Sequence, residues 1–495
     1  MSYTKIAVRG AATVFIISII AAFLGYLARF IMARNLTVEQ FGLFYAIFGF
    51  LALISIFKTL GFDKCLIKFI PEFYSQKKLN FIKSSIIYVS IIQLITNAFV
   101  IVIIYLLSGF LAMHFFRVEQ ADIILKYMAI AFFIDSFTAI LKFSFQGFKK
   151  MFLFSLVDLI RMLLIVITLL IGFKKGFGIQ SPVIAYILAP LILIIFFGWI
   201  LVKYVFPKWS KTSFIKDKNL LKKLSKYSLF IVLTGSGAIL VLYTDTILLT
   251  FFTGVAAVGL YNVAAPTAKI LTYFPTALGS VLLPITSELW TKKKNVLVEE
   301  GIGLLYKYSM IITLPLVLIM VSFPDLILLV LFGKQYVPAA NALKILSIGT
   351  IFITLHTINI NFFSGIGKPE IHSRMIYIAA TFNLIANLIL IPILGIIGAA
   401  LATATSFFIM MVIGLTKIKK FIKIKLPLEI WAKTLLIGAI FTIVIWLLKK
   451  FIFFNVWAET IIILTISGII YIILLFLFKI ITITELRDLY KRILK

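Results

Sequence analysis

Ionisable side chains interrupt stretches of this sequence that are apolar enough to cross a membrane. They are three cations and three carboxylates: Arg29, Arg161, Lys269, Asp135, Asp158 and Asp245. A charge near the middle of a bilayer costs about 2.5–3.5 kcal/mol even on the most lenient scale. We therefore expect these groups to face a bundle interior or a water-filled cavity. There the cations would bind an anionic substrate group, and the carboxylates would serve as coupling or gating groups.

Asp158 and Arg161 are three residues apart, so they share one face of a helix. One interpretation is a neutralised internal pair that fixes helix packing. The other makes Arg161 a cavity cation, with Asp158 orienting it or binding a coupling cation. Asp135 has no obvious partner nearby in the sequence. It would bind a coupling cation or pair with another residue of its half of the protein.

Lys269 lies deep in its apolar stretch, roughly 12 Å from the end if the helix rises regularly. That depth is too great for its amine to reach the interface easily. Pro266, Pro275 and Pro284 flank it, and prolines kink helices and free backbone carbonyls. Lys269 is therefore interpreted as a cavity cation, with an ion pair to Asp245 as the alternative.

Asparagines add polar groups to the later apolar stretches, and four are candidates for a polar cavity: Asn359, Asn361, Asn383 and Asn387. Asn383 and Asn387 are four residues apart, so they are neighbours on one helix face. That spacing suits hydrogen bonds between helices or contacts to a sugar.

The composition predicts an all-α integral membrane protein. Hydrophobic residues make up 62% of the 495 and charged residues 13%, and the mean hydropathy is +1.15. Soluble domains are about half apolar and a quarter charged. A spanning helix needs about 20 mostly apolar residues. About fourteen stretches qualify: 10–33, 41–60, 84–107, 124–145, 152–172, 181–205, 228–252, 261–283, 308–332, 339–363, 372–392, 396–416, 431–448 and 460–478.

The net charge of +30 is distributed as a membrane protein requires. If both termini are cytoplasmic, lysines and arginines on the cytoplasmic side outnumber those outside by more than three to one. We therefore expect a multi-pass protein of the cell membrane with both termini in the cytoplasm, and no nucleic-acid partner. The first apolar run, 10–32, is too long for a signal peptide and is interpreted as a retained span.

An internal repeat organises these spans. "LTVEQFGLFYA" (36–46) is echoed by "TGVAAVGLYNV" (253–263), with Gly42 matching Gly259, and "ADIILKYMAI" (121–130) by "AANALKILSI" (339–348). The constant spacing predicts two pseudo-symmetric lobes of six helices plus two C-terminal helices. The predicted domains are then an N-terminal lobe (1–206), a cytoplasmic linker (207–227), a C-terminal lobe (228–420), and two additional helices with a cytoplasmic tail (421–495). Parallel repeats of this kind are typical of alternating-access transporters.

Asp245 stands one position from the repeat equivalent of Arg29, so equivalent helices carry opposite charges at nearly the same depth. An ion pair between them would form a gate. For Arg29 the alternative is that its side chain reaches the outer interface, because it lies about one turn from the helix end.

Three segments resemble Wzx-type polysaccharide-lipid flippases. They are "ARNLTVEQFGLFYAI", "YTDTILLTFFTGVAAVGLYNVAAP" and "LVLFGKQYVPAANALKIL". These flippases belong to a superfamily with the multidrug and toxin extruders and the lipid II flippases. The resemblance spans the chain and implies a six-plus-six-plus-two plan with a V-shaped central cavity. It also implies movement of isoprenoid-linked oligosaccharides from the cytoplasmic to the outer leaflet.

The leading hypothesis is a flippase for a polyprenyl- or dolichyl-pyrophosphate oligosaccharide, because a cation-bearing cavity lowers the barrier for its headgroup. A cation-coupled multidrug and toxin extruder and a lipid II-type flippase are the alternatives. A membrane-embedded glycosyltransferase is disfavoured, because no long loop carries a carboxylate cluster. We expect no catalytic residues, cofactor or metal site. Coupling to Na⁺ or H⁺ stays open. We expect a monomer, with association to a glycan polymerase or glycosyltransferases left open.

Overall fold

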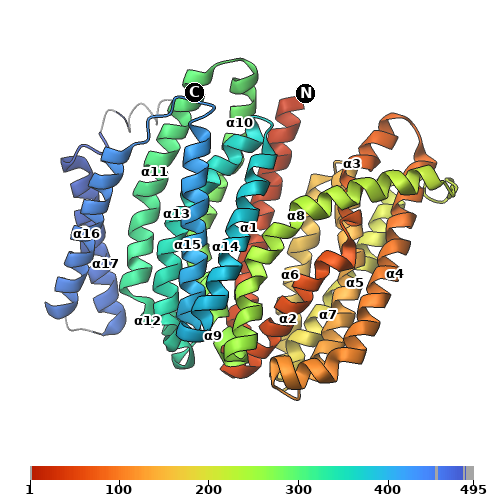
Figure 1. The fold of residues 1–495 in the computed structure, drawn as a ribbon, viewed down its shortest axis with the longest axis horizontal. Coiled ribbons are helices and arrows are strands. Elements are labelled where there is room, and N and C mark those ends of the chain that lie inside the picture. Colours follow the sequence, from red (N-terminus) through yellow and green to blue (C-terminus); the bar gives the residue numbers. More distant parts are fainter. Residues whose placement is uncertain (1–2, 452–454, 483–484, 486–495) are drawn as a thin grey trace. The chain divides into compact units, whose positions relative to one another are not determined.

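The computed structural model describes residues 3–451, 455–482 and 485, and over these residues the chain is helical with no strand (Figure 1). Within this described part of the chain, thirteen helices are long and apolar enough to cross a membrane. A further helix, α8 (Lys218–Thr253), contains a shorter apolar stretch, Ile239–Thr253. The predicted all-α, multi-pass membrane fold is confirmed.

The helices follow the chain in the order of the expected spans. In the first half they are α1 (Tyr3–Asn35), α2 (Val38–Thr59), α3 (Phe62–Ser75), α4 (Leu79–Leu111), α5 (Ala121–Gly147), α6 (Met151–Lys174) and α7 (Gln180–Ile200). After α8 come α9 (Val255–Lys269), α10 (Tyr273–Thr291), α11 (Asn295–Ser322), α12 (Pro324–Leu331), α13 (Ala340–Gly365), α14 (Pro369–Leu394), α15 (Ile396–Ile418), α16 (Leu428–Phe451) and α17 (Val456–Leu477).

Two expected spans are broken in the structure. The stretch 261–283 is divided, because α9 ends at Lys269 and a 3₁₀ turn, Ile270–Thr272, leads into α10. Pro266 lies inside α9, and its ring removes one backbone donor just before this break. The stretch 308–332 is divided at Phe323, because Pro324 starts α12. Proline suits the first position of a helix and cannot continue the preceding one.

The ends of α2 are set by local sequence. Thr37 forms a capping box with Gln40, in which each side chain accepts a hydrogen bond from the other residue's backbone N–H. At the other end Leu60 and Gly61 adopt left-handed backbone conformations, with φ of 45° and 73°. The chain therefore turns sharply into α3.

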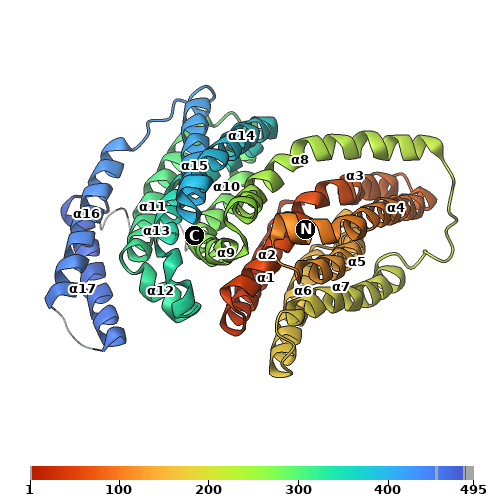
Figure 2. The ribbon, with the colours of Figure 1, turned by 60° about the horizontal axis from the view of Figure 1, so that its bottom comes forward.

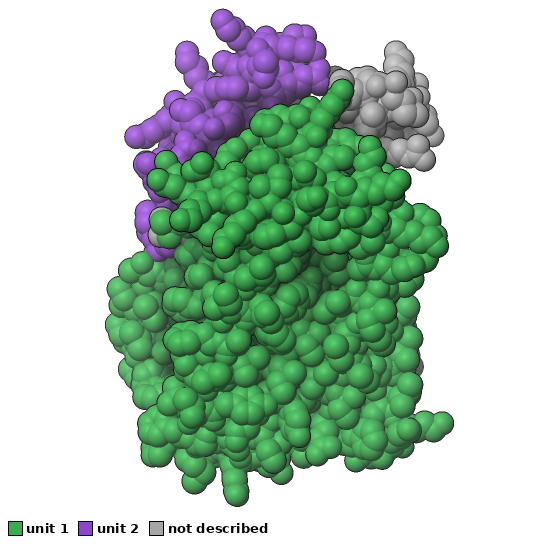
Figure 3. Space-filling view, turned by 90° about the vertical axis from the view of Figure 1, so that its right-hand side faces the viewer, with its two compact units in different colours: residues 1–263, 331–336, 380–399 green, residues 264–330, 337–379, 400–495 purple. Residues whose placement is uncertain are grey.

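Packing divides the molecule into two compact units (Figure 3). The first unit comprises residues 1–263, 331–336 and 380–399, and the second comprises 264–330, 337–379 and 400–495. In the first unit α1 packs on α6, and α5 packs on α4 and α7. The long α8 runs past α2, α3 and α4 (Figure 2). In the second unit α13 packs on α10 and α11, and α16 packs on α17. The domain boundaries that the repeat suggests stay a prediction.

The repeat reappears as a repeated glycine contact. A Cβ on Gly147 would lie 2.6 Å from the Leu66 carbonyl oxygen, so α5 approaches α3 closely. A Cβ on Gly365 would lie 3.1 Å from the Leu283 carbonyl oxygen, so α13 approaches α10 closely in the same way. Leu66 and Leu283 are separated by nearly the same number of residues as the two glycines. Equivalent helices in the two halves therefore pack through equivalent residues.

Candidate functional site

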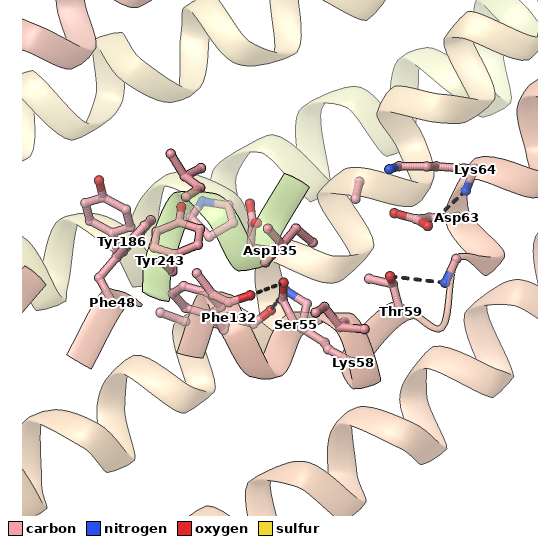
Figure 4. A pocket seen from close by; sticks show the side chains of 18 of the residues that line it. Phe48, Ser55, Lys58, Thr59, Asp63, Lys64, Phe132, Asp135, Tyr186 and Tyr243 are labelled. Atoms are coloured by element: carbon pink, nitrogen blue, oxygen red, sulfur yellow. Dashed lines mark hydrogen bonds between the residues drawn. The ribbon is translucent and has the colours of Figure 1, made fainter. Parts of the chain in front are cut away.

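A cavity of about 450 Å³ lies within the first unit (Figure 4). Helices α2, α3, α5, α6, α7 and α8 all contribute to its wall. Its charged lining residues are Lys58, Asp63, Lys64, Asp135 and Arg161. The volume falls in the range of small-molecule sites, which are mostly apolar with a few convergent polar groups.

Arg161 on α6 connects the predicted charges into one network. Its Nη1 donates a hydrogen bond to Asp135 Oδ1 on α5 over 2.8 Å. Its Nη2 is 3.9 Å from Asp158 Oδ1, and the other oxygen of Asp158 is 2.5 Å from Lys142 Nζ. Asp135 is thus paired with a residue of the adjacent helix, and a coupling role for it stays a prediction.

Lys58 is a cavity cation that the sequence did not single out. It is 8% exposed, and its Nζ donates to the Phe132 carbonyl oxygen over 2.5 Å. Lys58 stands in the last turn of α2 and Lys142 near the end of α5, so both resemble interfacial anchors in the sequence. The turn at Gly61 is what brings the end of α2 and the start of α3 to the same cavity.

The cavity is polar at one end and aromatic at the other. Phe48, Tyr186 and Tyr243 lie together at one end in Figure 4, and Asp63 and Lys64 lie at the other. The described lining residues include three cations and two carboxylates, so the lining carries an excess positive charge. Burial raises the pKa of Asp63 above its usual value. A hydrogen bond from the Lys64 N–H to its carboxylate acts in the opposite direction and lowers that pKa.

Asp245 lies in a separate polar cage of the same unit. It is 5% exposed and accepts hydrogen bonds from the Tyr261 hydroxyl and from Asn387 Nδ2, the latter over 2.7 Å. Asn387 Nδ2 also donates to Asn383 Oδ1 over 3.0 Å, and both asparagines are fully buried. Asn387 Oδ1 has no hydrogen-bond partner among the described residues. Oxygen atoms of this kind suit a hard cation such as Na⁺.

Arg29 joins three helices of the first unit. Its guanidinium donates to the Asn262 carbonyl oxygen on α9, and it lies 4.3 Å from the ring centroid of Tyr45 on α2. A gate between Arg29 and Asp245 stays a prediction.

The remaining candidates belong to the second unit. Lys269 is exposed and is the last residue of α9. Asn359 on α13 is fully buried and accepts a hydrogen bond from the Tyr306 hydroxyl on α11. Asn361 Nδ2 donates to the Thr357 carbonyl oxygen over 2.8 Å. The two asparagines therefore make contacts within the helix bundle, and a cavity role for them or for Lys269 stays a prediction.

Comparison with protein families gives two matches. Residues 7–290 match the family described as "Polysaccharide biosynthesis protein". Residues 238–389 match the family described as "MatE". The first match covers more than half of the chain.

Individual proteins resemble this chain over its whole length or part of it. "Uncharacterized membrane protein MJ1068" of Methanocaldococcus jannaschii is 34% identical over 100% of both chains. "Probable low-salt glycan biosynthesis flippase Agl15" of Haloferax volcanii is 29% identical over 41% of this chain and 43% of its own length. Among solved structures, "Lipid II flippase MurJ, inward closed conformation" matches with a TM-score of 0.78 at 18% identity. That match covers 96% of this chain and 99% of the other, and it shows a shared fold.

Proposed function

Because this chain belongs to the polysaccharide biosynthesis protein family, we propose that it flips a lipid-linked oligosaccharide from the cytoplasmic to the outer leaflet of the cell membrane. The carrier is a polyprenyl or dolichyl pyrophosphate, and the product serves cell-surface polysaccharide or glycoconjugate synthesis. Transport proceeds by alternating access, as in many transporters built from two repeats.

The cation-bearing cavity of the first unit is the observation that carries this proposal. A pyrophosphate headgroup with its sugars cannot cross hydrocarbon unaided, since charges and hydroxyls lose their water there. Arg161 and Lys58 place two cations within one cavity. Arginine pairs well with phosphate because its planar donors match the oxygens. These two residues therefore bind the pyrophosphate, while the isoprenoid chain stays in lipid.

The aromatic end of the cavity suits the sugar. Phe48, Tyr186 and Tyr243 present flat apolar faces, and the two tyrosines add hydroxyls that hydrogen-bond. Binding sites combine such surfaces with a few polar groups that fix the ligand's orientation. The headgroup then lies with phosphate toward Lys58 and the first sugar toward Tyr186.

The Asp245 cage is the candidate for coupling. A single carboxylate surrounded by the neutral groups of Tyr261, Asn383 and Asn387 binds one Na⁺ or one H⁺ without excess charge. Occupation of this cage would bias the helices that supply its groups, α8, α9 and α14, toward one conformation.

A cation-coupled extruder is the second candidate, favoured by the "MatE" match over residues 238–389. Organic cations prefer acidic or aromatic cavities. The aromatic end of this cavity would suit such a cation, but the lining carries more cations than carboxylates. The charge of the cavity therefore favours an anionic substrate.

Transport by the purified chain in proteoliposomes distinguishes these functions. Four substrates are compared: a lipid-diphosphate oligosaccharide, a lipid II-type lipid, the carrier lipid phosphate alone, and a fluorescent organic cation. Flipping of the two glycan-bearing lipids is read from glycosidase access on the other side, flipping of the lipid phosphate from phosphatase access, and transport of the cation from its fluorescence. We expect the oligosaccharide lipid to be flipped faster than the others. Transport of the organic cation alone would refute the proposal, and preference for the lipid II-type substrate would replace it with that alternative.

A further inference from the structure

We propose that Asp135 is the release group of the cavity: it competes with the bound anion for Arg161 and recaptures the guanidinium when the anion leaves. The anion is a diphosphate if the proposed function holds, but the competition depends only on its negative charge. Asp158, which also faces Arg161, has the different role of a fixed anchor.

The Arg161–Asp135 pair is open to the cavity. Both residues line it, and their side chains are 31% and 35% exposed. An anion that enters the cavity therefore reaches the guanidinium directly. Arg161 also has spare donors, since a guanidinium carries five N–H groups. Nη1 donates to Asp135, whereas Nη2 is 3.9 Å from Asp158 Oδ1, which is too far for a hydrogen bond.

A phosphate and Asp135 compete for the same guanidinium, that of Arg161. Two anions within hydrogen-bond distance of one guanidinium repel each other, and this repulsion is strong in a partly dry cavity. An anion bound at Arg161 therefore has to displace the carboxylate of Asp135. The return of that carboxylate lowers the affinity for the anion, which a transporter needs because a substrate held too tightly is not released.

Asp158 is not free to take part in this exchange. Its Oδ2 is 2.5 Å from Lys142 Nζ, while its Oδ1 is 3.9 Å from Arg161 Nη2, beyond hydrogen-bond distance. Lys142 therefore holds Asp158 in place. Asp158 positions the guanidinium from one side and leaves its other side to Asp135 or to the anion.

Anion binding to the full-length chain in detergent tests this division of roles. The probe is inorganic pyrophosphate, measured by isothermal titration calorimetry. We expect Asp135→Asn to bind pyrophosphate about tenfold more tightly than the wild type. Asp135→Glu, which keeps the charge, should bind within about threefold of the wild type. Asp158→Asn should not tighten binding, and Arg161→Ala should abolish it.

Asp122→Asn is the matched control, because it removes a carboxylate of the same helix that pairs with Lys126 at 2.9 Å and does not line the cavity. Its affinity for pyrophosphate should equal that of the wild type. Melting temperature and elution volume report folding. If Asp135→Asn does not fold, Asp135→Ser carries the same expectation.

The result that overturns the inference is a folded, charge-removing Asp135 variant that binds pyrophosphate no more tightly than the wild type. Binding that survives Arg161→Ala overturns it as well, because the anion would then lie elsewhere. This outcome is distinct from failure of the proposed function. The pyrophosphate affinities of the variants could follow the expected order while the oligosaccharide lipid is not flipped. That result would support the release role of Asp135 and refute the proposed substrate.

Discussion

Gly42 on α2 and Gly259 on α9 pack directly against each other. A Cβ on Gly42 would lie 2.8 Å from the Gly259 backbone nitrogen, and a Cβ on Gly259 would lie 3.3 Å from the Gly42 nitrogen. Neither glycine has a positive φ. They hold equivalent places in the internal repeat. The repeated motif therefore serves a close helix crossing within the first unit, where two backbones meet without side chains between them.

This contact predicts that Gly259→Ala destabilises the protein. The added methyl group meets backbone atoms of Val38 and Gly42, which cannot move aside as a flexible side chain would. Overpacking of this kind costs about 1–3 kcal/mol. A lower melting temperature in detergent would show it. Gly198→Ala on α7 is the control, since nothing lies within 4 Å of its added Cβ. It should be neutral or slightly stabilising. Equal melting temperatures for both variants would contradict the close-contact interpretation.

The sequence predicts the spans and the intramembrane charges because both have large free-energy costs that only a few arrangements satisfy. It does not predict which charges meet. Arg161 is three residues from Asp158, yet its close partner is Asp135 on another helix. That choice depends on how α5 and α6 are rotated against each other. The sequence does not predict Lys58 as a cavity residue for a different reason. A lysine in the last turn of a span usually anchors that span at the interface.

Helix breaks were partly predictable. The prolines near Lys269 indicated a distortion, and α9 does end at that residue. The apolar pattern does not predict the break at Phe323, because it continues through Pro324. Hydropathy alone does not indicate where a new helix starts. The partner of Asn359 was also hidden, since Tyr306 is far from it in the sequence.

The Asp245 cage predicts a cation-dependent step. Asp245→Asn removes the negative charge that a bound Na⁺ or H⁺ would neutralise, so transport should become insensitive to both ion gradients. The measurement is the flipping rate in proteoliposomes with imposed Na⁺ and pH gradients. Asp325→Asn, which alters an exposed carboxylate at the start of α12, should leave the dependence unchanged. A sodium or proton dependence that persists in Asp245→Asn would exclude Asp245 as the coupling group.

The Tyr306–Asn359 hydrogen bond should contribute to stability. Tyr306→Phe leaves the Asn359 Oδ1 acceptor buried without its donor, which costs about 1–3 kcal/mol. We expect a lower melting temperature with transport largely retained. Tyr127→Phe, which alters a tyrosine that is 52% exposed, should not change the melting temperature. Full loss of transport in a folded Tyr306→Phe variant would instead indicate that Asn359 acts in the transport pathway.

The membrane orientation can be tested because Cys65 is the only cysteine and is fully buried. The native chain should therefore react little with a membrane-impermeant maleimide. Lys175→Cys, between α6 and α7, should be labelled on intact cells. Lys149→Cys, between α5 and α6, should be labelled only after permeabilisation. The reverse pattern would place the termini outside.

Flipping of a lipid-diphosphate oligosaccharide by Arg161→Ala tests the central claim most directly. Lys126→Ala is the control, because Lys126 pairs with Asp122 away from the cavity. Both variants are reconstituted at equal protein density, and glycosidase access to the glycan is followed over time. If the Arg161 guanidinium binds the headgroup, the Arg161 variant should lose flipping at least tenfold while the Lys126 variant keeps the wild-type rate. Equal rates in the wild type and a correctly inserted Arg161→Ala variant would contradict the account.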